Sequence, residues 1–352
     1  MIDLALIFGG LSSEHAISCV SASNVASNLD PEKYNIRKVG ITKEGYWYLT
    51  DASREQIADG TWENLGANIP VTLSSNRMVK GLLEIGGEGR VFHIDCVLPM
   101  LHGKFGEDGT IQGLCELAGI RFVGPGVCSS AVSIDKSLTK LIVGTTGIRQ
   151  ADCFVALHGD FADDPEQTFN RIEEHFSGKY PLFIKPAREG SSIGVYKVSN
   201  RGELEKYLKA AFSFDKKLLV EEAIEGKEVE VAVLGNEDPK ASVVGEILAA
   251  NDFYDFNAKY ENAESRTVIP AGISKKASDE LRRSALTIYK ALECKGLSRV
   301  DFFLCPDDTV VFNEINTIPG FTNISMYPQL WNASGIPYSE LLDKLIDFSE
   351  AE

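Results

Sequence analysis

The pattern of apolar and polar positions predicts an antiparallel β-hairpin near the end of the chain. Two apolar segments, 299–304 and 309–314, flank a Pro-Asp-Asp turn. Side chains alternate between the two faces of a strand, so each strand directs three residues to one face. If the loop has two or four residues, the two sets share that face, and they are Arg299, Asp301, Phe303, Phe312, Glu314 and Asn316.

Three oxygen-bearing side chains of this face suggest a metal site. Asp301, Glu314 and Asn316 would converge beside Arg299, on strands that are otherwise apolar. Unpaired carboxylates are costly in such surroundings, so a bound hard cation, most simply Mg²⁺, is the natural counter-charge. The alternative is an ordinary hairpin whose acidic side chains face water. The segment Thr-Ile-Pro-Gly-Phe, which follows the second strand directly, favours the metal site.

Elsewhere, short apolar segments alternate with segments of helical spacing, which predicts a mixed α/β (α+β) fold. Residues 3–8 form a buried strand that runs into a glycine turn and a helix, a Rossmann-like opening without the dinucleotide pattern GxGxxG. Residues 160–166 are predicted to form a polar loop. Further strands are predicted at 36–41, 94–100, 180–185, 218–222 and 229–235. The predicted domains are 1–124, 125–220 and 221–352.

Length and composition are those of a globular protein, with 352 residues of which 44% are apolar and 24% charged. No apolar run approaches the roughly 20 residues that span a bilayer, and the N-terminus does not resemble a signal peptide. We therefore expect a cytoplasmic protein that does not associate with membranes. A net charge of −16 argues against nucleic acid as a partner. The seven scattered cysteines are expected to be reduced and not to bind zinc.

A candidate phosphate-binding flap follows the predicted strand that ends at Lys185. Glycine and serine in residues 187–195 allow backbone donors to approach oxygen atoms closely, and the lysine supplies a positive charge. A flexible hairpin tip would explain the glycines but not the lysine. Glu221 and Glu228 lie at strand ends and are candidates to accept hydrogen bonds from an adenine and a ribose; the alternative is ordinary sheet-edge charge.

Three further segments are candidate ligand-binding loops. Glu14 follows the first strand, and either N-terminal capping or a ligand role suits it. Residues 101–110, with His102 and Glu107, follow a strand at the edge where open α/β sheets bind ligands. Residues 251–262 are aromatic and polar without period, which suits a lid.

These segments together resemble the ATP-grasp fold with a Rossmann-like N-terminal domain. Within that superfamily the chain is similar to the D-alanine–D-alanine ligases, and the similarity extends over nearly the full length. The matching segments are 8–22, 101–120, 134–140, 183–195, 252–260 and 298–328.

The resemblance implies that the cofactors are ATP and two Mg²⁺ ions, for which Mn²⁺ is a possible substitute. Asp301, Glu314 and Asn316 would hold the metal ions. The ATP-binding residues would be Lys136, Lys185, Glu221, Glu228 and Lys259.

It also implies roles around the substrates. Glu14 would bind the ammonium group of the first D-alanine, with His102 near its carboxylate and Glu107 as a supporting contact. Ser191 and Tyr260 would join Glu14 in latching the lid. The other implied residues are Lys259, Ser325 and Met326 around the second D-alanine, and Arg299 with the backbone near Gly320 as stabilisers of an oxyanion.

The implied reaction joins two D-alanines through a D-alanyl phosphate to give D-alanyl-D-alanine for peptidoglycan, in a homodimeric enzyme. Residues 71–85 also resemble ligases of glycopeptide resistance, which use D-serine or D-lactate as the second substrate. Lys259 and Tyr260 in the lid favour D-alanine. Glu222 and the pair Asn323-Ile324 depart from the family pattern. A non-catalytic ATP-binding module or another ATP-grasp ligase explains the motifs less well.

Overall fold

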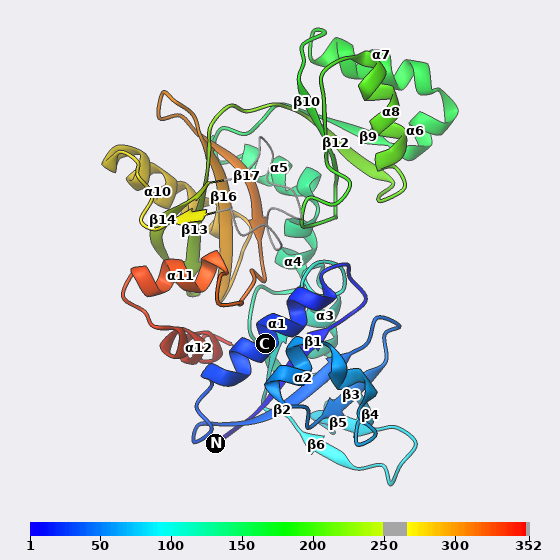
Figure 1. The fold of residues 1–352 in the computed structure, drawn as a ribbon, viewed down its shortest axis with the longest axis vertical. Helices are drawn as coiled ribbons and strands as arrows, with labels where there is room; N and C mark the ends of the chain where they lie inside the picture. Colours follow the sequence, from blue (N-terminus) through cyan, green and yellow to red (C-terminus); the bar gives the residue numbers. More distant parts are fainter. Residues whose placement is uncertain (249–265, 350–352) are drawn as a thin grey trace.

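The computed structural model describes residues 1–248 and 266–349, whose strands form three sheets (Figure 1). The strands of the first sheet are β1 Ile2–Gly9, β2 Tyr34–Ile41, β3 Trp47–Thr50, β4 Ile69–Leu73, β5 Gly81–Glu84, β6 Val91–His93, β7 Cys96–Met100 and β8 Arg121–Phe122. They are ordered β6-β5-β4-β3-β2-β1-β7-β8, and β2, β1, β7 and β8 run parallel.

The parallel part of this sheet positions two of the candidate loops. Strands β1 and β7 are neighbours, and residues 10–14 and 101–109 follow their carboxyl ends. The loops that follow adjacent parallel strands begin at the same edge of the sheet, so these two loops lie side by side. The helices and the short 3₁₀ turn in this part are α1 His15–Asn28, α2 Arg54–Ala58, η1 Thr61–Asn64 and α3 Thr110–Ala118.

The second sheet is antiparallel, in the order β11-β10-β12-β9. Its strands and helices are β9 Cys153–Leu157, α6 His158–Asp163, α7 Pro165–His175, β10 Leu182–Pro186, β11 Tyr196–Val198, α8 Arg201–Ala211 and β12 Lys217–Glu222. The expectation of a polar loop at 160–166 is wrong, because most of these residues are helical. Asp164 caps α7 by accepting a bond from the N–H of Gln167, and Pro165 occupies the first turn, where a missing N–H costs nothing.

The third sheet is also antiparallel, in the order β15-β14-β13-β16-β17. Its strands are β13 Lys227–Leu234, β14 Lys240–Leu248, β15 Arg266–Val268, β16 Leu297–Leu304 and β17 Val310–Asn316. The helix α10 Lys275–Ala291 packs an apolar face on this sheet. Two further helices, α4 Val127–Ile134 and α5 Lys136–Gly144, connect the first sheet to the second.

The predicted hairpin is confirmed as β16 and β17. Its register, however, is set by an irregularity within β17 and not by an even loop length. Near the turn Leu304 pairs with Val310, a register that alone would set Asn313 opposite Asp301. An irregularity in β17 shifts the pairing, so that Asp301 faces Glu314. Phe312, which the even loop placed beside Glu314, instead pairs with Phe302 in the apolar core.

The last helices return to the beginning of the chain. The helix α11 Met326–Ala333 packs on the third sheet, and α12 Tyr338–Asp347 lies beside α1 in Figure 1. Leu341 and Leu345 share one apolar core with Leu4 of β1. Tyr34 of β2 donates a hydrogen bond of 2.8 Å to Asp343 of α12, which also holds this helix against the first sheet.

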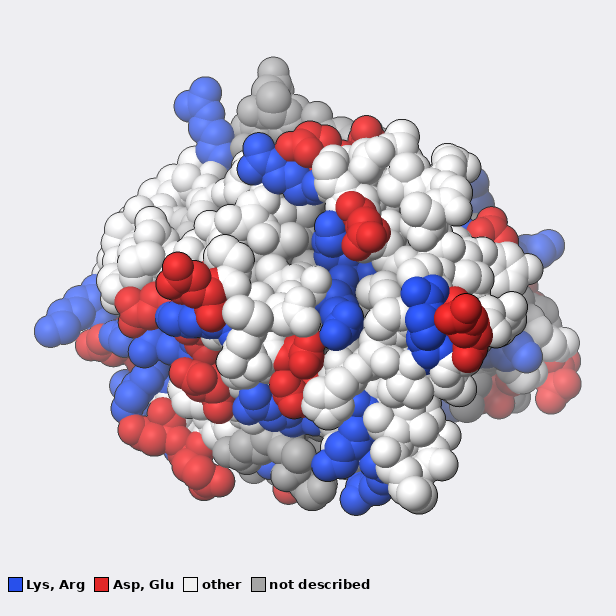
Figure 2. All heavy atoms as spheres, turned by 90° about the horizontal axis from the view of Figure 1, so that it is seen from below, with Lys and Arg blue, Asp and Glu red and all other residues white. Residues whose placement is uncertain are grey.

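In the described ranges 1–248 and 266–349, no helix is both long and apolar enough to cross a membrane. Figure 2 views the molecule from the end that carries the first sheet. On this face, Lys and Arg side chains lie among Asp and Glu side chains.

Candidate active site

Two cavities meet beneath the flap of residues 187–195. The first, of 580 Å³, lies between the second and third sheets, and the second, of 120 Å³, lies between the first and third sheets. Ser191 and Glu314 line both. The first cavity also contacts Lys136, Lys185, Glu221, Glu228 and Asn313, and the second contacts Glu14, His102, Glu107, Arg299, Asn316, Gly320, Ser325 and Met326.

Glu221 forms the charged floor of the first cavity. Its carboxylate lies 2.6 Å from the Nζ atom of Lys185 and 2.9 Å from that of Lys140. Burial would raise the pKa of Glu221, but the two ammonium groups outweigh it and lower the pKa to about 2. Burial likewise opposes the charge of Lys185, yet Glu221 raises its pKa above the ordinary value. Both residues are therefore ionised at neutral pH.

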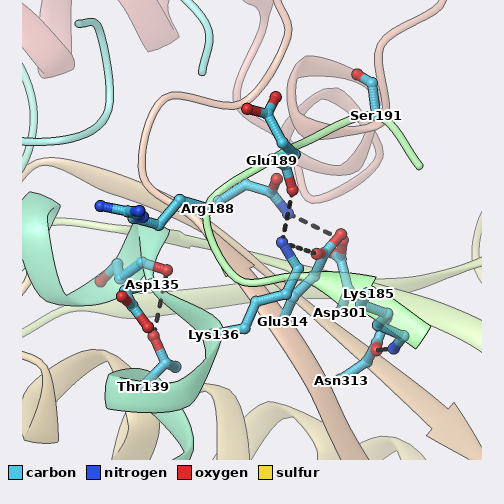
Figure 3. A network of polar contacts seen from close by, with 12 residues as sticks. Asp135, Lys136, Thr139, Lys185, Arg188, Glu189, Ser191, Asp301, Asn313 and Glu314 are labelled. Carbon is cyan, nitrogen blue, oxygen red and sulfur yellow. Dashed lines mark hydrogen bonds and ion pairs between the residues drawn. The ribbon is translucent and has the colours of Figure 1, made fainter. Parts of the chain in front are cut away.

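Lys136 points from the start of α5 into the space between the cavities (Figure 3). Its Nζ atom donates to the backbone carbonyl of Glu189 at 2.8 Å and lies 3.7 Å from Glu314. Asp135 precedes it and caps the helix by accepting bonds from two backbone N–H groups. The capped helix end and the flap thus hold one ammonium group close to a carboxylate of β17.

The flap is fixed at its base and reaches across to the first sheet. Arg188 clamps Asp215 with two side-chain hydrogen bonds, of 3.2 and 2.7 Å. Ser191, in the left-handed backbone region with φ of 51°, donates a short hydrogen bond to Glu14. Glu14 precedes α1 but makes no side-chain capping bond. Its carboxylate therefore faces the flap, which removes the capping interpretation.

Glu107 and His102 hold the segment that follows β17. Glu107 is partly buried and accepts bonds from the N–H groups of Gly103 at 2.8 Å and Ile318 at 2.9 Å. His102 contacts the carbonyl of Ile318 through Nδ1, also at 2.9 Å. Burial and the charge of Glu14 raise the pKa of Glu107 to about 7, while burial lowers the pKa of His102. Both main-chain groups of Ile318 are thereby held by the loop after β7.

The predicted oxygen cluster of the hairpin is assembled in the structure. Asp301 accepts two bonds of 2.8 Å from Arg299 and one of 3.0 Å from the Asn316 amide, and Glu314 faces it across the strands. Within residues 1–248 and 266–349, no three His, Cys, Asp or Glu side chains form a metal-binding group. The expected set contains only two carboxylates, with an amide oxygen as its third donor. This all-oxygen set suits Mg²⁺.

Ser325 closes the second cavity from the other side. Its Oγ atom accepts a bond of 2.9 Å from the N–H of Thr322. An added Cβ atom at Gly320 would lie 2.9 Å from the same oxygen, so only glycine fits there without a shift. Met326 begins α11 and is buried. Lys259 and Tyr260, the two lid residues of the prediction, lie outside the described residues.

Some polar residues in or beside the two cavities were missed from the sequence, among them Lys140, Glu230 and Asn313. Lys140 lies four residues after Lys136 on α5, a spacing that puts both on one helical side. Glu230 follows Glu228 by two positions on a strand, so the alternation could have placed both on one face. Asn313 gave no such signal, because only the irregularity in β17 turns it toward Lys185.

Comparison with known proteins gives matches over almost the whole chain. The family described as D-ala D-ala ligase N-terminus matches residues 3–125, and D-ala D-ala ligase C-terminus matches residues 142–347. The D-alanine–D-alanine ligase of Clostridium acetobutylicum is 45% identical over 98% of this chain and 97% of its own length. That of Ruminiclostridium cellulolyticum is 47% identical over 98% and 94%.

Solved structures agree. The VanG D-Ala:D-Ser ligase of Enterococcus faecalis superimposes with a TM-score of 0.90 and 42% identity over 99% of both chains. The D-alanine–D-alanine ligase of Coxiella burnetii gives 0.85 and 37%, over 99% of this chain and 95% of that one.

The three-sheet architecture and the site between the sheets define a protein of the ATP-grasp class. The predicted fold is thus confirmed. Both family matches and the identity over nearly the full length make the assignment finer: the chain belongs to the D-alanine–D-alanine ligase family.

Proposed function

We propose that this chain uses ATP to join two D-alanines into D-alanyl-D-alanine for peptidoglycan synthesis. The observation that carries the proposal is the meeting of the two cavities at Ser191 and Glu314. A nucleotide in the first cavity would direct its terminal phosphate toward an amino acid in the second.

In this proposal, each side chain has a physical task in the first half-reaction. Lys136 and Lys185 offset the charge of the ATP phosphates, and Glu221 and Glu228 lie on the nucleoside side. Glu14 binds the ammonium group of the first D-alanine. The carboxylate of this D-alanine attacks the γ-phosphorus of ATP, forming a C–O–P linkage and releasing ADP.

In the second half-reaction, the amine of the second D-alanine attacks the acyl carbon. The C–N bond forms, the C–O bond to phosphate breaks, and the amine loses a proton. Arg299 and the backbone N–H near Gly320 stabilise the oxyanion, and Ser325 and Met326 border the attacking substrate. His102 lies beside the first substrate's carboxylate, and Lys259 and Tyr260 are proposed to close the site with Ser191.

The donor set Asp301, Glu314 and Asn316 is proposed to hold two Mg²⁺ ions, with Mn²⁺ as a substitute. When bound, these ions would offset the charge of the transferred phosphoryl group. We also propose a homodimer, which sedimentation at micromolar concentration would test.

A second candidate product ends in D-serine. Its support is the similarity to the VanG D-Ala:D-Ser ligase, which matches this chain over 99% of its length. The two candidates share the fold and the first half-reaction, and they differ only in the attacking amine.

The deciding experiment measures Mg²⁺-dependent phosphate release from ATP with D-alanine alone, and then with D-serine or D-lactate added. Mass spectrometry identifies the products. We expect D-alanyl-D-alanine as the main product. A mixed product at a comparable rate would favour the second candidate, and no phosphate release with any D-amino acid would contradict both.

Activity is expected to rise from pH 6 to pH 8 or 9, because the attacking amine must be neutral and the neutral fraction of an α-amino group grows with pH across this range. Initial rates with saturating ATP across this range test the expectation. A flat profile would show that deprotonation of the amine does not limit the rate.

A further inference from the structure

Glu230 is a buried carboxylate in the second cavity that the proposed reaction leaves without a task. It lies on β13, directly opposite Asp301 on β16, in the middle of the third sheet. Its side chain is 7% exposed and contributes to the cavity wall. A carboxylate is rarely placed in such a position without a charged partner, because its desolvation is costly.

Its partner is Arg299. The Nε atom of Arg299 lies 2.9 Å from the Glu230 carboxylate, and the same guanidinium gives two bonds of 2.8 Å to Asp301. One buried guanidinium is therefore shared by two carboxylates from neighbouring strands. Burial opposes its charge, but Asp301 and Glu230 raise the pKa of Arg299 well above its ordinary value.

The two carboxylates differ in what else surrounds them. Asp301 also accepts a bond from the Asn316 amide and faces Glu314, so it belongs to the oxygen cluster that suits a divalent cation. A cation bound there would compete for the Asp301 oxygens and repel the guanidinium. If Asp301 were the sole partner of Arg299, losing it to the cation would cost several kcal/mol, as for any buried charge that loses its partner. Glu230 offers Arg299 a partner that does not belong to the cluster.

We propose that Glu230 is a positioning residue that keeps Arg299 in the second cavity while Asp301 binds the cation. In this structure both Nε and Nη2 donate to Asp301, and Glu230 lies 2.9 Å from Nε. When a cation occupies Asp301, Glu230 would accept the Nε hydrogen bond and leave Nη2 directed at the reacting acyl group. The inference rests on the proposed function, since it assigns Arg299 to the oxyanion and Asp301 to the metal.

The first test compares Glu230→Gln and Glu230→Met with a matched control, Glu246→Gln. Glu246 is equally buried in the same sheet and pairs with Lys227 at 2.9 Å, away from both cavities. We expect kcat to fall about tenfold in Glu230→Gln, which keeps an acceptor for Nε, and about a hundredfold in Glu230→Met. The KM for ATP should change less than twofold in both. Equal kcat values for Glu230→Met and the control would overturn the proposal.

The second test measures Mn²⁺ binding by titration in the presence of ADP, which requires no turnover. Glu230→Met should weaken Mn²⁺ binding about tenfold, because Arg299 then competes for Asp301. In an Arg299→Met background the same substitution should have no effect. An equal loss in both backgrounds would mean that Glu230 acts on the cation through space, which contradicts the proposal.

The two tests separate the inference from the function on which it rests. If the wild-type chain ligates no D-amino acid but the Mn²⁺ results hold, the proposed function fails and the role of Glu230 stands. If ligation is found and Mn²⁺ binding is unchanged in Glu230→Met, the inference alone fails.

Discussion

Glu221 shows how one residue sets the electrostatics of a whole cavity. Two ammonium groups lie within 2.9 Å of its carboxylate, and all three side chains are largely shielded from water. Without the carboxylate, Lys140 and Lys185 would repel each other in a poorly solvated place. The carboxylate of Glu221 therefore sets where the ammonium groups that would bind an anionic nucleotide lie.

Glu221→Gln should destabilise the protein by about 3–5 kcal/mol, because it leaves two buried ammonium groups without a counter-charge. The KM for ATP should rise as well, since Lys185 loses the contact that positions it. Urea unfolding and initial rates check the two effects. Glu205→Gln, at a partly exposed ion pair with Arg201, is the control and should change stability by less than about 1 kcal/mol. Equal stability of the two variants would contradict the expectation.

Glu107 makes stability depend on pH near neutrality. Its pKa is raised to about 7, so the folded protein binds this proton more tightly than the unfolded chain does. The stabilisation is complete below about pH 4.3, the ordinary pKa of a glutamate, and is lost as pH rises through 7. About 1.4 kcal/mol per pKa unit gives a total of about 4 kcal/mol.

The unfolding free energy of the wild-type protein should therefore decline between pH 4.5 and 7.5, and in Glu107→Gln this decline should be absent. Urea unfolding of both proteins at several pH values in this window measures it. Parallel curves for the two proteins would show that the pKa of Glu107 is not raised in the folded state.

At this scale the sequence predicted which residues line the site better than it predicted their partners. Lys185 and Glu221 both line the first cavity, as expected, yet Glu221 contacts lysines that lie 36 and 81 positions away in the chain. Such pairs depend on how the sheet strands stack, and β-strand alternation carries no information about contacts between distant segments.

Among the elements, the hairpin β16–β17 depends on one extra residue. The irregularity in β17 lets Asn313 and Glu314 face the first cavity in succession, where a regular strand would turn one of them away. Asn313 accepts a bond of 3.2 Å from Lys185. The sequence predicted the hairpin and the facing acidic residues but not this irregularity, because alternation assumes a period of two throughout.

Asn313→Ala should raise the KM for ATP by about ten- to a hundredfold, since the loss of one hydrogen bond to a charged group costs roughly 1.5–3 kcal/mol. The value of kcat should change little. Initial rates at varied ATP concentration measure both constants. Asn332→Ala, at an exposed position of α11, serves as the control. A fall in kcat with unchanged KM would place Asn313 in the chemical step instead.

At the scale of the whole molecule, the two ends of the described chain share one core. Leu345 of α12 is buried with residues of β1 and α1, more than 300 positions earlier in the sequence. The amphipathic pattern of 338–347 predicted a helix but not its partner. The three domains predicted from the sequence, divided at 124 and 220, remain a proposal. In that division, α12 belongs to the third domain and packs on the first domain.

Leu345→Ala should cost about 2–5 kcal/mol, the usual range for a truncated buried leucine. Hydrogen exchange should accelerate in α1 and β1 as well as in α12, because they share the core. Lys344→Ala, at a partly exposed neighbour, is the control. Faster exchange confined to α12 would mean that the first sheet is stable without it.

The shared core also has a consequence for how the chain is made. A ribosome releases β1 and α1 long before residues 338–347 exist, so the apolar surface that α12 covers is exposed while the intervening residues are made. The first sheet can begin to pair its strands in that interval, but its packing is completed only when α12 emerges. Nascent chains of this protein are therefore expected to need protection from aggregation until residues 338–347 have left the ribosome.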